Sequence, residues 1–288
     1  MRSLSPVLPN SAAAARESAN HAALRSGLRI EVVHDLERLE TVRQLIDEIW
    51  QPAANDPPIT RSLLRALTHA GNYSALAYDG NTVLGVCLGF LGVEPANTLH
   101  SHITGVIGAG AGRQVGYALK LDQRAWALER GLSAITWTYD PLVRRNAFFN
   151  ITKLGARPVE YAVDFYGDMS DAINAGQRTD RLVTSWDLAG SIAVTSLAET
   201  VAIDIERLVA GGAEIVLDET REQLPVARES AAPVRLVRVP DDIEKLRSSA
   251  PELATEWRYA VREALGGLMN RGWSVTGMSR DGYYLLEQ

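Results

Sequence analysis

The sequence lacks the features that would tie it to a membrane or an oxidising compartment. Only one of its 288 residues is a cysteine, Cys87, so no intramolecular disulfide can form and a reducing compartment is expected. No apolar run approaches the ~20 residues that a membrane span needs, and residues 1–27 contain no apolar stretch typical of a signal peptide. We therefore expect a cytoplasmic protein with no membrane partner.

Basic residues are fewer than acidic residues, with 29 Lys and Arg against 35 Asp and Glu, and the net charge is −6. Because no Lys/Arg-rich run is present, a nucleic-acid partner held through its phosphates is not expected. A weakly acidic surface favours a small cationic amine over a polyanion. Hydrophobic residues make up 46% and charged residues 22% of the chain, which is typical of a globular protein. The length fits one large domain or two fused modules.

Periodicity and turn residues predict the order of elements in the first half of the chain. Asp35 and Thr60 are placed to cap helices that run over 36–49 and 61–69. Asp79-Gly80-Asn81 separates two apolar runs and indicates a hairpin. The remaining expected elements are strands over 28–33, 73–78, 83–91, 98–107, 133–139, 157–165 and 181–188, and helices over 116–130 and 144–154, with one or two helical turns over 168–174.

The second half of the chain gives weaker signals until residue 234. A strand is expected over 234–239, and Pro251 fits the first turn of an amphipathic helix that ends near Arg271. Residues 274–286 are typical of a hairpin broken at Asp281-Gly282. The predicted organisation is a mobile N-terminal arm (1–27), a first module (28–190), a linker or peripheral segment (191–233) and a β-α-β extension packed on the core (234–288).

A strand that runs into a glycine-rich turn and then into a helix spans residues 99–130. Such a turn leaves several backbone N–H groups pointing at one spot, at the positive end of the helix dipole. The pattern therefore predicts a cradle for an anion.

The residues of this segment resemble the acyl-CoA-binding core of the GNAT superfamily of N-acetyltransferases. The resemblance lies in Arg113, Gly116 and Ala118, in Asn146-Ala147-Phe148-Phe149 and in Lys153-Leu154-Gly155-Ala156. It is closer to a subfamily of predicted acyltransferases with a long C-terminal extension, through residues 99–102, 136–142 and 164–167. The resemblance implies an α/β (α+β) fold with a mixed, mostly antiparallel central sheet flanked by helices. It also implies acetyl-CoA or another acyl-CoA as co-substrate.

Roles for individual residues follow from this resemblance. The turn would hold the CoA pyrophosphate, backbone N–H groups of Val106 or Ile107 would bind the thioester carbonyl, and Asn146 would contact the pantetheine arm. The full set expected to bind the acyl-CoA is Val106, Ile107, Gly112, Arg113, Gln114, Val115, Gly116, Tyr117, Asn146 and Phe149. The set expected to bind the acceptor is Trp137, Asp140, Arg144 and Tyr166.

The chain departs from the usual pattern of the superfamily at two places. In the expected frame of the turn it carries Ala111, Gln114 and Gly116, so the first arginine and the first glycine are replaced. The tyrosine that often protonates the leaving thiolate is replaced by Ile151, which has no proton to donate. Tyr139, Tyr161 and Tyr166 are the candidate substitutes, and each can equally be a packing residue.

His100 and His102 are the ionisable residues whose spacing points most clearly to a catalytic role. Residues two apart on a strand point to the same face, and Thr98 and Thr104 are expected to share it. A histidine there could take the proton of an attacking amine, with His102 as the favoured general base. The alternatives are two hydrogen-bonded structural imidazoles or a His-x-His metal site. No Asp, Glu or Cys lies at a suggestive spacing, so no metal is expected.

The leading hypothesis is an acyl-CoA-dependent N-acyltransferase that moves an acetyl or succinyl-type group to a small amine, with an amino acid as first candidate. A degenerate module that binds CoA or an acyl group without transfer is the alternative. A third interpretation, a nucleotide-dependent oxidoreductase, rests on Gly110, Gly112 and Gly116, whose spacing misses the usual fingerprint. Arg258 and Arg262 share a helix face and could close the active site, hold a homodimer or form a salt-bridged surface.

Overall fold

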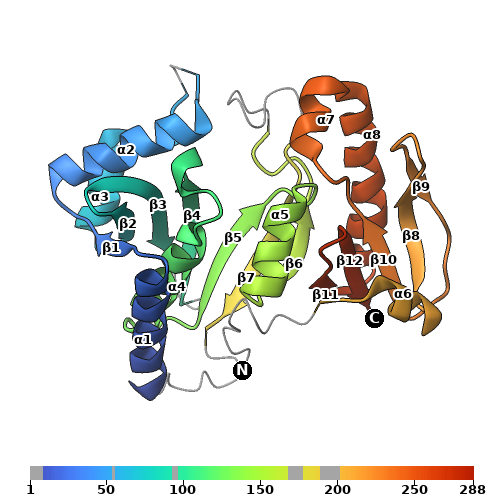
Figure 1. The fold of residues 1–288 in the computed structure, drawn as a ribbon, viewed down its shortest axis with the longest axis horizontal. Coiled ribbons are helices and arrows are strands. Elements are labelled where there is room, and N and C mark those ends of the chain that lie inside the picture. The colour runs from blue at the N-terminus through green and yellow to red at the C-terminus, as the bar shows by residue number, and fades with distance from the viewer. Residues whose placement is uncertain (1–8, 54–55, 93–96, 168–177, 189–201) are drawn as a thin grey trace. The chain divides into compact units, whose positions relative to one another are not determined.

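The computed structural model describes residues 9–53, 56–92, 97–167, 178–188 and 202–288 (Figure 1). The chain divides into two compact units. Among the described residues, the first unit comprises those up to Trp137 with Asp187 and Leu188, and the second comprises the rest. The division falls within strand β5 (Ala134–Tyr139). The expected helical turns over 168–174 lie outside the described residues.

The first unit begins with elements whose ends match their capping residues. The side chains of Asp35 and Thr60 accept hydrogen bonds from the N–H groups of Arg38 and Leu63, as N-caps do. The predicted hairpin at Asp79-Gly80-Asn81 is confirmed, with Gly80 at φ +56°. The elements are α1 (Pro9–Arg25), β1 (Arg29–Val32), α2 (Leu36–Trp50), α3 (Arg61–His69), β2 (Tyr73–Asp79), β3 (Thr82–Leu91), β4 (Thr98–Val106), a 3₁₀ turn (Gly108–Gly110) and α4 (Val115–Leu128).

The main sheet has seven strands in the order β1-β2-β3-β4-β5-β7-β6, with β6 (Arg157–Ala162) and β7 (Arg181–Asp187). Strands β1 to β4 pair antiparallel, β6 and β7 also pair antiparallel, and β4 and β5 are parallel. The predicted fold class is therefore confirmed. The oxidoreductase interpretation is wrong, because a dinucleotide-binding fold needs a run of parallel strands.

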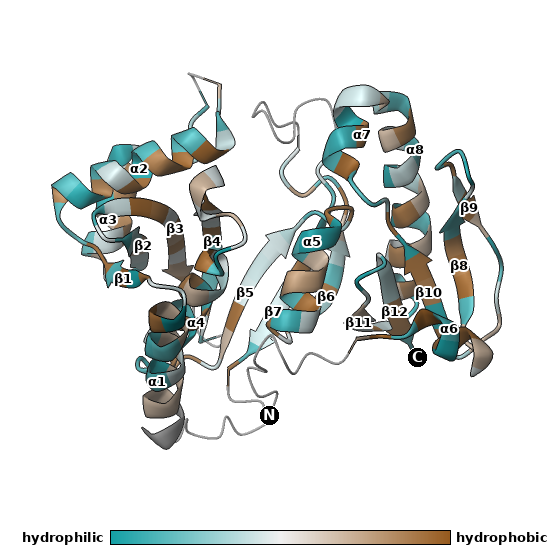
Figure 2. Ribbon diagram, in the orientation of Figure 1, coloured by the Kyte–Doolittle hydropathy of each residue, from teal (hydrophilic) through white to brown (hydrophobic). Residues whose placement is uncertain are grey.

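Helices cover both faces of the sheet in the first unit. Side chains of α2 and α3 bury an apolar cluster against one face, which includes Ile46, Leu64 and Ile103. On the other face α4 lies so close that a side chain at Gly85 would meet Val115 and Leu119. Because it is covered on both faces, β3 is apolar along most of its length (Figure 2).

Residues 9–25 form helix α1, where the sequence predicts a mobile arm. Ala15, Ala19 and Ala23 recur every four residues and are buried, and α1 packs along α4. Small side chains let two helices approach closely, so an alanine stripe suffices to dock this helix. Arg16 adds an ion pair to Glu129, with 2.7 Å between Nε and Oε1, and a second to Asp122.

The second unit contains its own five-stranded sheet, in the order β11-β12-β10-β8-β9. Where the sequence predicts a linker or peripheral segment over 191–233, the structure has α6, β8 and β9 from Ile205 onward. The strand β8 pairs parallel with β10. This is a long-range contact, which the local sequence does not predict. The elements are α5 (Arg144–Ala147), a π-helical segment (Phe148–Lys153), α6 (Ile205–Ala210), β8 (Glu214–Glu219), β9 (Pro225–Ala227), β10 (Val234–Arg238), α7 (Ile243–Ser249), α8 (Pro251–Val261), a second π-helical segment (Arg262–Gly266), α9 (Gly267–Asn270), β11 (Ser274–Met278) and β12 (Tyr283–Glu287).

The helix α8 and the π-helical segment after it are anchored in this unit by two arginine–carboxylate pairs, of which the first is buried and the second partly buried. Arg258, 1% exposed, binds both oxygens of Asp140 at 2.8 and 2.7 Å. Arg262 binds both oxygens of Asp180 at 2.9 and 2.6 Å. Tyr284 donates from its hydroxyl to the carbonyl of Pro141 at 2.8 Å. The expectation of a salt-bridged helix surface is therefore wrong for Arg258, which is an internal ion-pair residue.

Replacing Arg258 with alanine should destabilise the protein strongly. The change leaves the buried carboxylate of Asp140 without its bidentate partner, and removing one partner of a buried ion pair costs about 3–5 kcal/mol. Urea unfolding should show this loss, whereas Arg271→Ala, at an exposed position, should change the free energy of unfolding by less than about 0.5 kcal/mol. Equal stability of the two variants would contradict an internal role for Arg258.

Candidate functional site

The loop between β4 and α4 has the backbone geometry of an anion cradle. Gly112 and Gln114 adopt left-handed conformations, with φ of +76° and +62°, and Gln114 is the N-cap of α4 without a side-chain capping bond. The first helical bond runs from the N–H of Ala118 to the carbonyl of Gln114. The N–H groups of Val115 and Gly116 thus lie in the first turn, where a helix has no acceptors of its own.

Other parts of the loop are already engaged. The N–H groups of Gly110, Ala111 and Arg113 close local turns onto carbonyls of the same loop. The guanidinium of Arg113 binds Asp79 at the β2–β3 hairpin, with 2.8 Å between Nη1 and Oδ2. The predicted cation of the cradle therefore pairs with a carboxylate of the hairpin in this structure, and the cradle is formed by the backbone of residues 112–116.

The pairing of β4 with β5 is short. It joins Thr98 to Ala134, Leu99 to Ile135 and His100 to Thr136, and ends there. In contrast, β4 pairs with β3 from Leu99 to Val106. From Ser101 to Val106, the backbone groups of β4 that point away from β3 therefore form no ladder with β5. We call this part of the strand the unused edge of β4. We call the point at His100 and Thr136 the fork.

The two predicted carbonyl-binding groups differ in their surroundings. The N–H of Ile107 donates to the carbonyl of Leu84 at 3.0 Å, so the proposed use of that group for a thioester is wrong. In an antiparallel pair successive residues alternate in the direction of their hydrogen bonds. The N–H of Val106 accordingly points away from β3, toward the unused edge of β4.

A β-bulge in β4 places the histidines. Leu88 pairs with Ile103 and Gly89 with Ser101, so His102 is the extra residue. The rings of His100 and His102 both lie near Phe90, with centroids 5.0 and 5.8 Å away, which confirms that they share a face. Thr104 does not share it, contrary to the prediction, because the bulge shifts the alternation. Its hydroxyl instead lies 3.2 Å from the Sγ of Cys87.

Both imidazoles are neutral near pH 7. The pKa of His100 is lowered to about 4, mainly by burial and also by the charges of His102 and Lys120. Its Nδ1 lies 3.3 Å from the hydroxyl oxygen of Thr136. Nearby protein atoms exclude part of the water around His102, and this desolvation also lowers its pKa. Part of the side chain nevertheless remains exposed to solvent. Of the two, His102 is the more exposed to solvent.

The opposite face of the same strands holds a buried lysine that sequence reasoning missed. The Nζ of Lys120, on α4, donates to the hydroxyl of Ser101 at 2.7 Å and lies 4.2 Å from the ring centroid of Trp137. Trp137, predicted to bind the acceptor, is itself buried beside this amine. No signal in the sequence marks this lysine, because the residues three and four positions from it on the helix include Tyr117, Gln123 and Arg124 and do not form an apolar stripe.

Two residues of the second unit that were predicted to bind the acceptor are instead part of ion pairs. Asp140 is buried and binds Arg258 and Arg247. Burial alone would raise the pKa of its carboxyl, but Arg258 and Arg247 hold it well below its usual range. Arg144 binds Asp241 and the carbonyl of Arg280. These contacts give Asp140 and Arg144 structural roles.

The three candidate tyrosines of the second unit have different environments. Burial raises the pKa of Tyr139 and Tyr161 well above its usual value, which makes each phenol a poor proton donor. Tyr161 donates to Asp180 at 2.8 Å. Tyr166 is exposed, and its hydroxyl lies 3.0 Å from that of Thr138. Asn146 is exposed, Phe149 is half-buried and Ile151 is buried.

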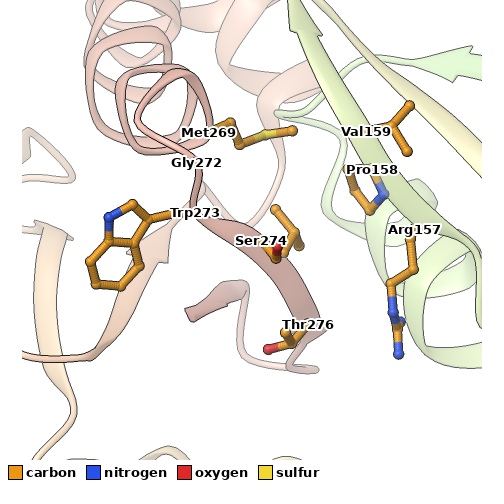
Figure 3. A pocket seen from close by; sticks show the side chains of 9 residues that line it. Arg157, Pro158, Val159, Met269, Gly272, Trp273, Ser274 and Thr276 are labelled. Atoms are coloured by element: carbon orange, nitrogen blue, oxygen red, sulfur yellow. The ribbon is translucent and has the colours of Figure 1, made fainter. Parts of the chain in front are cut away.

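A cavity of about 470 Å³ lies in the second unit (Figure 3). It is formed between residues 157–159 of the edge strand β6 and residues of α9, of β11 and of the turn between them, among them Met269 and Trp273. None of the site residues predicted from the sequence lines it. In the described part of the chain, no group of three or more His, Cys, Asp or Glu could hold a metal ion, and no helix has the length and apolar character needed to cross a membrane.

Comparison with known proteins gives matches at the level of structure. No protein-family model and no curated protein matches this chain. Similar solved structures include a ribosomal-protein-S18-alanine N-acetyltransferase from Escherichia coli (11% identity, 58% of this chain and 98% of that one, TM-score 0.43). A Bacillus subtilis acetyltransferase in complex with CoA has 19% identity over 56% of this chain and 98% of its own, with a TM-score of 0.44. A Salmonella typhimurium structure with acetyl-CoA has 12% identity over 59% and 99%, with a TM-score of 0.46. The likeness concerns the fold, and the ligands belong to those proteins.

The lowered pKa of His100 should make folding stability depend on pH. The folded-state pKa of about 4 lies below the ordinary 6.5, so between these values the unfolded chain binds more protons. The contribution of His100 is therefore present above pH 6.5 and is lost as the pH falls toward 4. His100→Gln should lose less stability than the wild type between pH 7 and pH 4.5 in urea unfolding. An NMR titration that gives His100 a pKa near 6.5 would contradict this.

Proposed function

We propose that this protein is an acyl-CoA-dependent N-acyltransferase that transfers an acyl group directly to a small amine. The observation that carries the proposal is the backbone cradle at residues 112–116, which opens next to the unused edge of β4. A pyrophosphate suits the N–H groups of Val115 and Gly116 at the start of α4. An extended arm with amide groups suits a strand edge that lacks a partner. Cradle and edge are continuous in the chain, as a CoA thioester requires.

Three groups of the first unit support the chemistry. His102 is neutral near pH 7 and exposed, so it can accept the proton that a neutral amine loses as it attacks the acyl carbon. The N–H of Val106 points to the edge of β4, close to the cradle, and can donate to an amide carbonyl of the CoA arm. Phe90 packs beside both histidines and shields one side of the imidazoles from water. These features favour direct attack by the amine over a covalent acyl-enzyme.

The acyl group is proposed to be acetyl or succinyl-type, and the acceptor an amino acid or a related small amine. The net charge of −6 favours a cationic acceptor over a polyanion. The acidic surface also disfavours nucleic acid.

A CoA-binding module without transferase activity is the second candidate. It is favoured by Arg113, whose charge is directed to Asp79, and by Ile151, which stands where a proton donor is common. The buried phenol of Tyr139 does not replace that donor, because its raised pKa keeps its proton. The two candidates share the cradle and differ in whether acyl transfer is observed when CoA binds.

Gly116→Asp should abolish or strongly weaken CoA binding without unfolding the protein. A side chain at Gly116 meets only Val106, at 3.8 Å, and a carboxylate in the first turn of a helix is favourable in itself. The new charge would repel a pyrophosphate at the same N–H groups. Calorimetry should show a drop in affinity of at least about tenfold, which corresponds to about 1.4 kcal/mol.

The matched controls are Gly116→Ala and Gly116→Asn, which add volume without charge. Alanine should bind CoA nearly as the wild type does, and asparagine should lie between the two. CoA binding that survives Gly116→Asp unchanged would show that the cradle holds some other group, and absence of binding by the wild type would refute the proposed function.

His102→Ala should lower kcat while leaving the affinity for CoA nearly intact. A positioned general base contributes about 10²–10⁴-fold to the rate, and the cradle is built of backbone. Because the pKa of His102 is lowered, the acidic limb of the wild-type pH–rate profile should lie below pH 6.5, and it should disappear in the variant. His69→Ala, at an exposed position of α3, is the control. Full activity of both His100→Ala and His102→Ala would place the base elsewhere.

A further inference from the structure

Lys120 is a buried amine in the first unit to which the proposed reaction has so far assigned no role. Its side chain is 4% exposed, and its Nζ donates to Ser101 at 2.7 Å and to Gln123 at 3.3 Å. The ring of Trp137 lies 4.2 Å away. All three contacts are neutral groups, and no carboxylate of a described residue is within ion-pair distance of the Nζ.

The charged and titratable groups around Lys120 come from several elements. On β3 the buried thiol of Cys87 interacts with it, and on β4 so does His100. On α4 itself the carboxylate of Asp122 binds the hydroxyl of Tyr73 and Arg16 of α1. Burial consequently lowers the pKa of Lys120 to about 8, with Cys87 acting in the opposite sense. A buried cation without an anion is unfavourable, so this amine would gain from an anion placed beside it.

Lys120 lies next to the fork, and this position determines where an anion could lie beside its amine. Ser101 is the first residue of β4 after the last pair with β5, and Trp137 is the first residue of β5 after it. The Nζ contacts both, so it lies at the fork on the α4 side of the sheet. The histidines lie on the other side, next to Phe90.

A CoA arm that starts at the cradle and follows the edge of β4 runs from Val106 toward Ser101. Six residue steps, one of them through the bulge at His102, lead from Ile107 to Ser101, which is at most about 20 Å. The pyrophosphate lies at the start of this path and the thioester sulfur at its far end. The sulfur therefore approaches the fork, where the pairing of β4 and β5 stops any further advance.

We propose that Lys120 is the proton donor to the leaving thiolate, in the role that Ile151 cannot fill. This rests on the proposed function. The nitrogen of the amine forms a bond to the acyl carbon, the carbon–sulfur bond breaks and its electron pair goes to sulfur. Lys120 transfers a proton from Nζ to that sulfur and becomes a neutral amine. His102 takes the proton that the attacking amine loses, and exchange with water restores both residues.

The pKa of this amine suits the role. A thiol has a pKa of about 8.5, so a donor whose pKa is near 8 transfers its proton to the thiolate at little cost. An ordinary lysine, with a pKa near 10.5, would hold its proton more tightly. The buried phenols of Tyr139 and Tyr161 hold theirs more tightly still.

The test measures the ionisation of CoA itself when bound, and needs no turnover. The ultraviolet absorbance of the thiolate is followed against pH for CoA on the wild type, on Lys120→Gln and on Lys120→Met, with desulfo-CoA as the blank. An opposite charge within about 4–6 Å lowers a pKa by about 1–3 units. The thiol of CoA on the wild type should therefore titrate lower than on either variant by about one unit or more.

Several controls keep the outcome clear. Glutamine at position 120 retains a donor for Ser101, so Lys120→Gln tests the charge without leaving that hydroxyl unpaired. Lys245→Met removes an exposed lysine of α7 and should leave the titration unchanged. Thermal melting identifies any variant that fails to fold, and Lys120→Arg keeps the cation with a pKa too high to give up its proton.

Kinetics supply the second readout. The basic limb of the wild-type pH–rate profile should fall near pH 8 and should be absent in Lys120→Gln, with kcat reduced and the Kd for CoA little changed. Lys120→Arg should restore the low pKa of the bound thiol but not kcat. If the wild type binds CoA and its thiol titrates as on Lys120→Gln, Lys120 has no such role although the proposed function stands. If the wild type binds no CoA, both proposals fail.

Discussion

β4 hydrogen-bonds to β3 over nearly its whole length but to β5 only through Thr98, Leu99 and His100. A strand with one complete and one incomplete ladder has backbone groups that its own sheet does not satisfy, and such groups must find water or a ligand. Most other features of the first unit depend on this asymmetry. It leaves an edge beside Val106, it ends at the fork contacted by Lys120, and the glycine-rich loop continues directly from it.

The bulge at His102 has an equally large effect on the two faces of β4. An extra residue shifts the alternation of side chains, so Ser101 and Thr104 face α4 while both histidines lie beside Phe90. The result is a basic amine and two neutral imidazoles on opposite sides of one strand. Burial keeps all three pKa values below their ordinary values, so the pKa of the amine moves toward neutral pH while both imidazoles stay neutral there.

The elements that the sequence predicts correctly are those set by local chemistry. Asp35 and Thr60 cap helices because their side chains reach the first free N–H groups, and Gly155 ends the helical segment before it at φ +71°. The bulge in β4 could not be predicted, since alternation over residues 98–104 fits a regular strand equally well. For the same reason Thr104 was placed on the wrong face.

Long-range partners explain the other differences. Asp140 follows a strand at an end where substrates often bind, yet it serves as the counter-ion of Arg258, 118 positions further on. Lys120 has mostly polar neighbours on its face of α4, and only its burial against Ser101 and Trp137 makes the amine unusual. A single sequence contains the residue types of such pairs but not the distances between them.

Helix α1 is part of the folded first unit, because it covers α4 and supplies a charge to it. Asp122 is 7% exposed and accepts from the hydroxyl of Tyr73 at 2.7 Å, with the cation of Arg16 as its counter-charge. A shortened chain that started at Leu28 would retain every strand of the sheet, yet α4 would present an uncovered apolar groove in which Asp122 keeps its bond from Tyr73 but has lost its counter-charge. Such a groove would attract any small-residue helix that carries a suitably placed arginine, including the α1 of another copy.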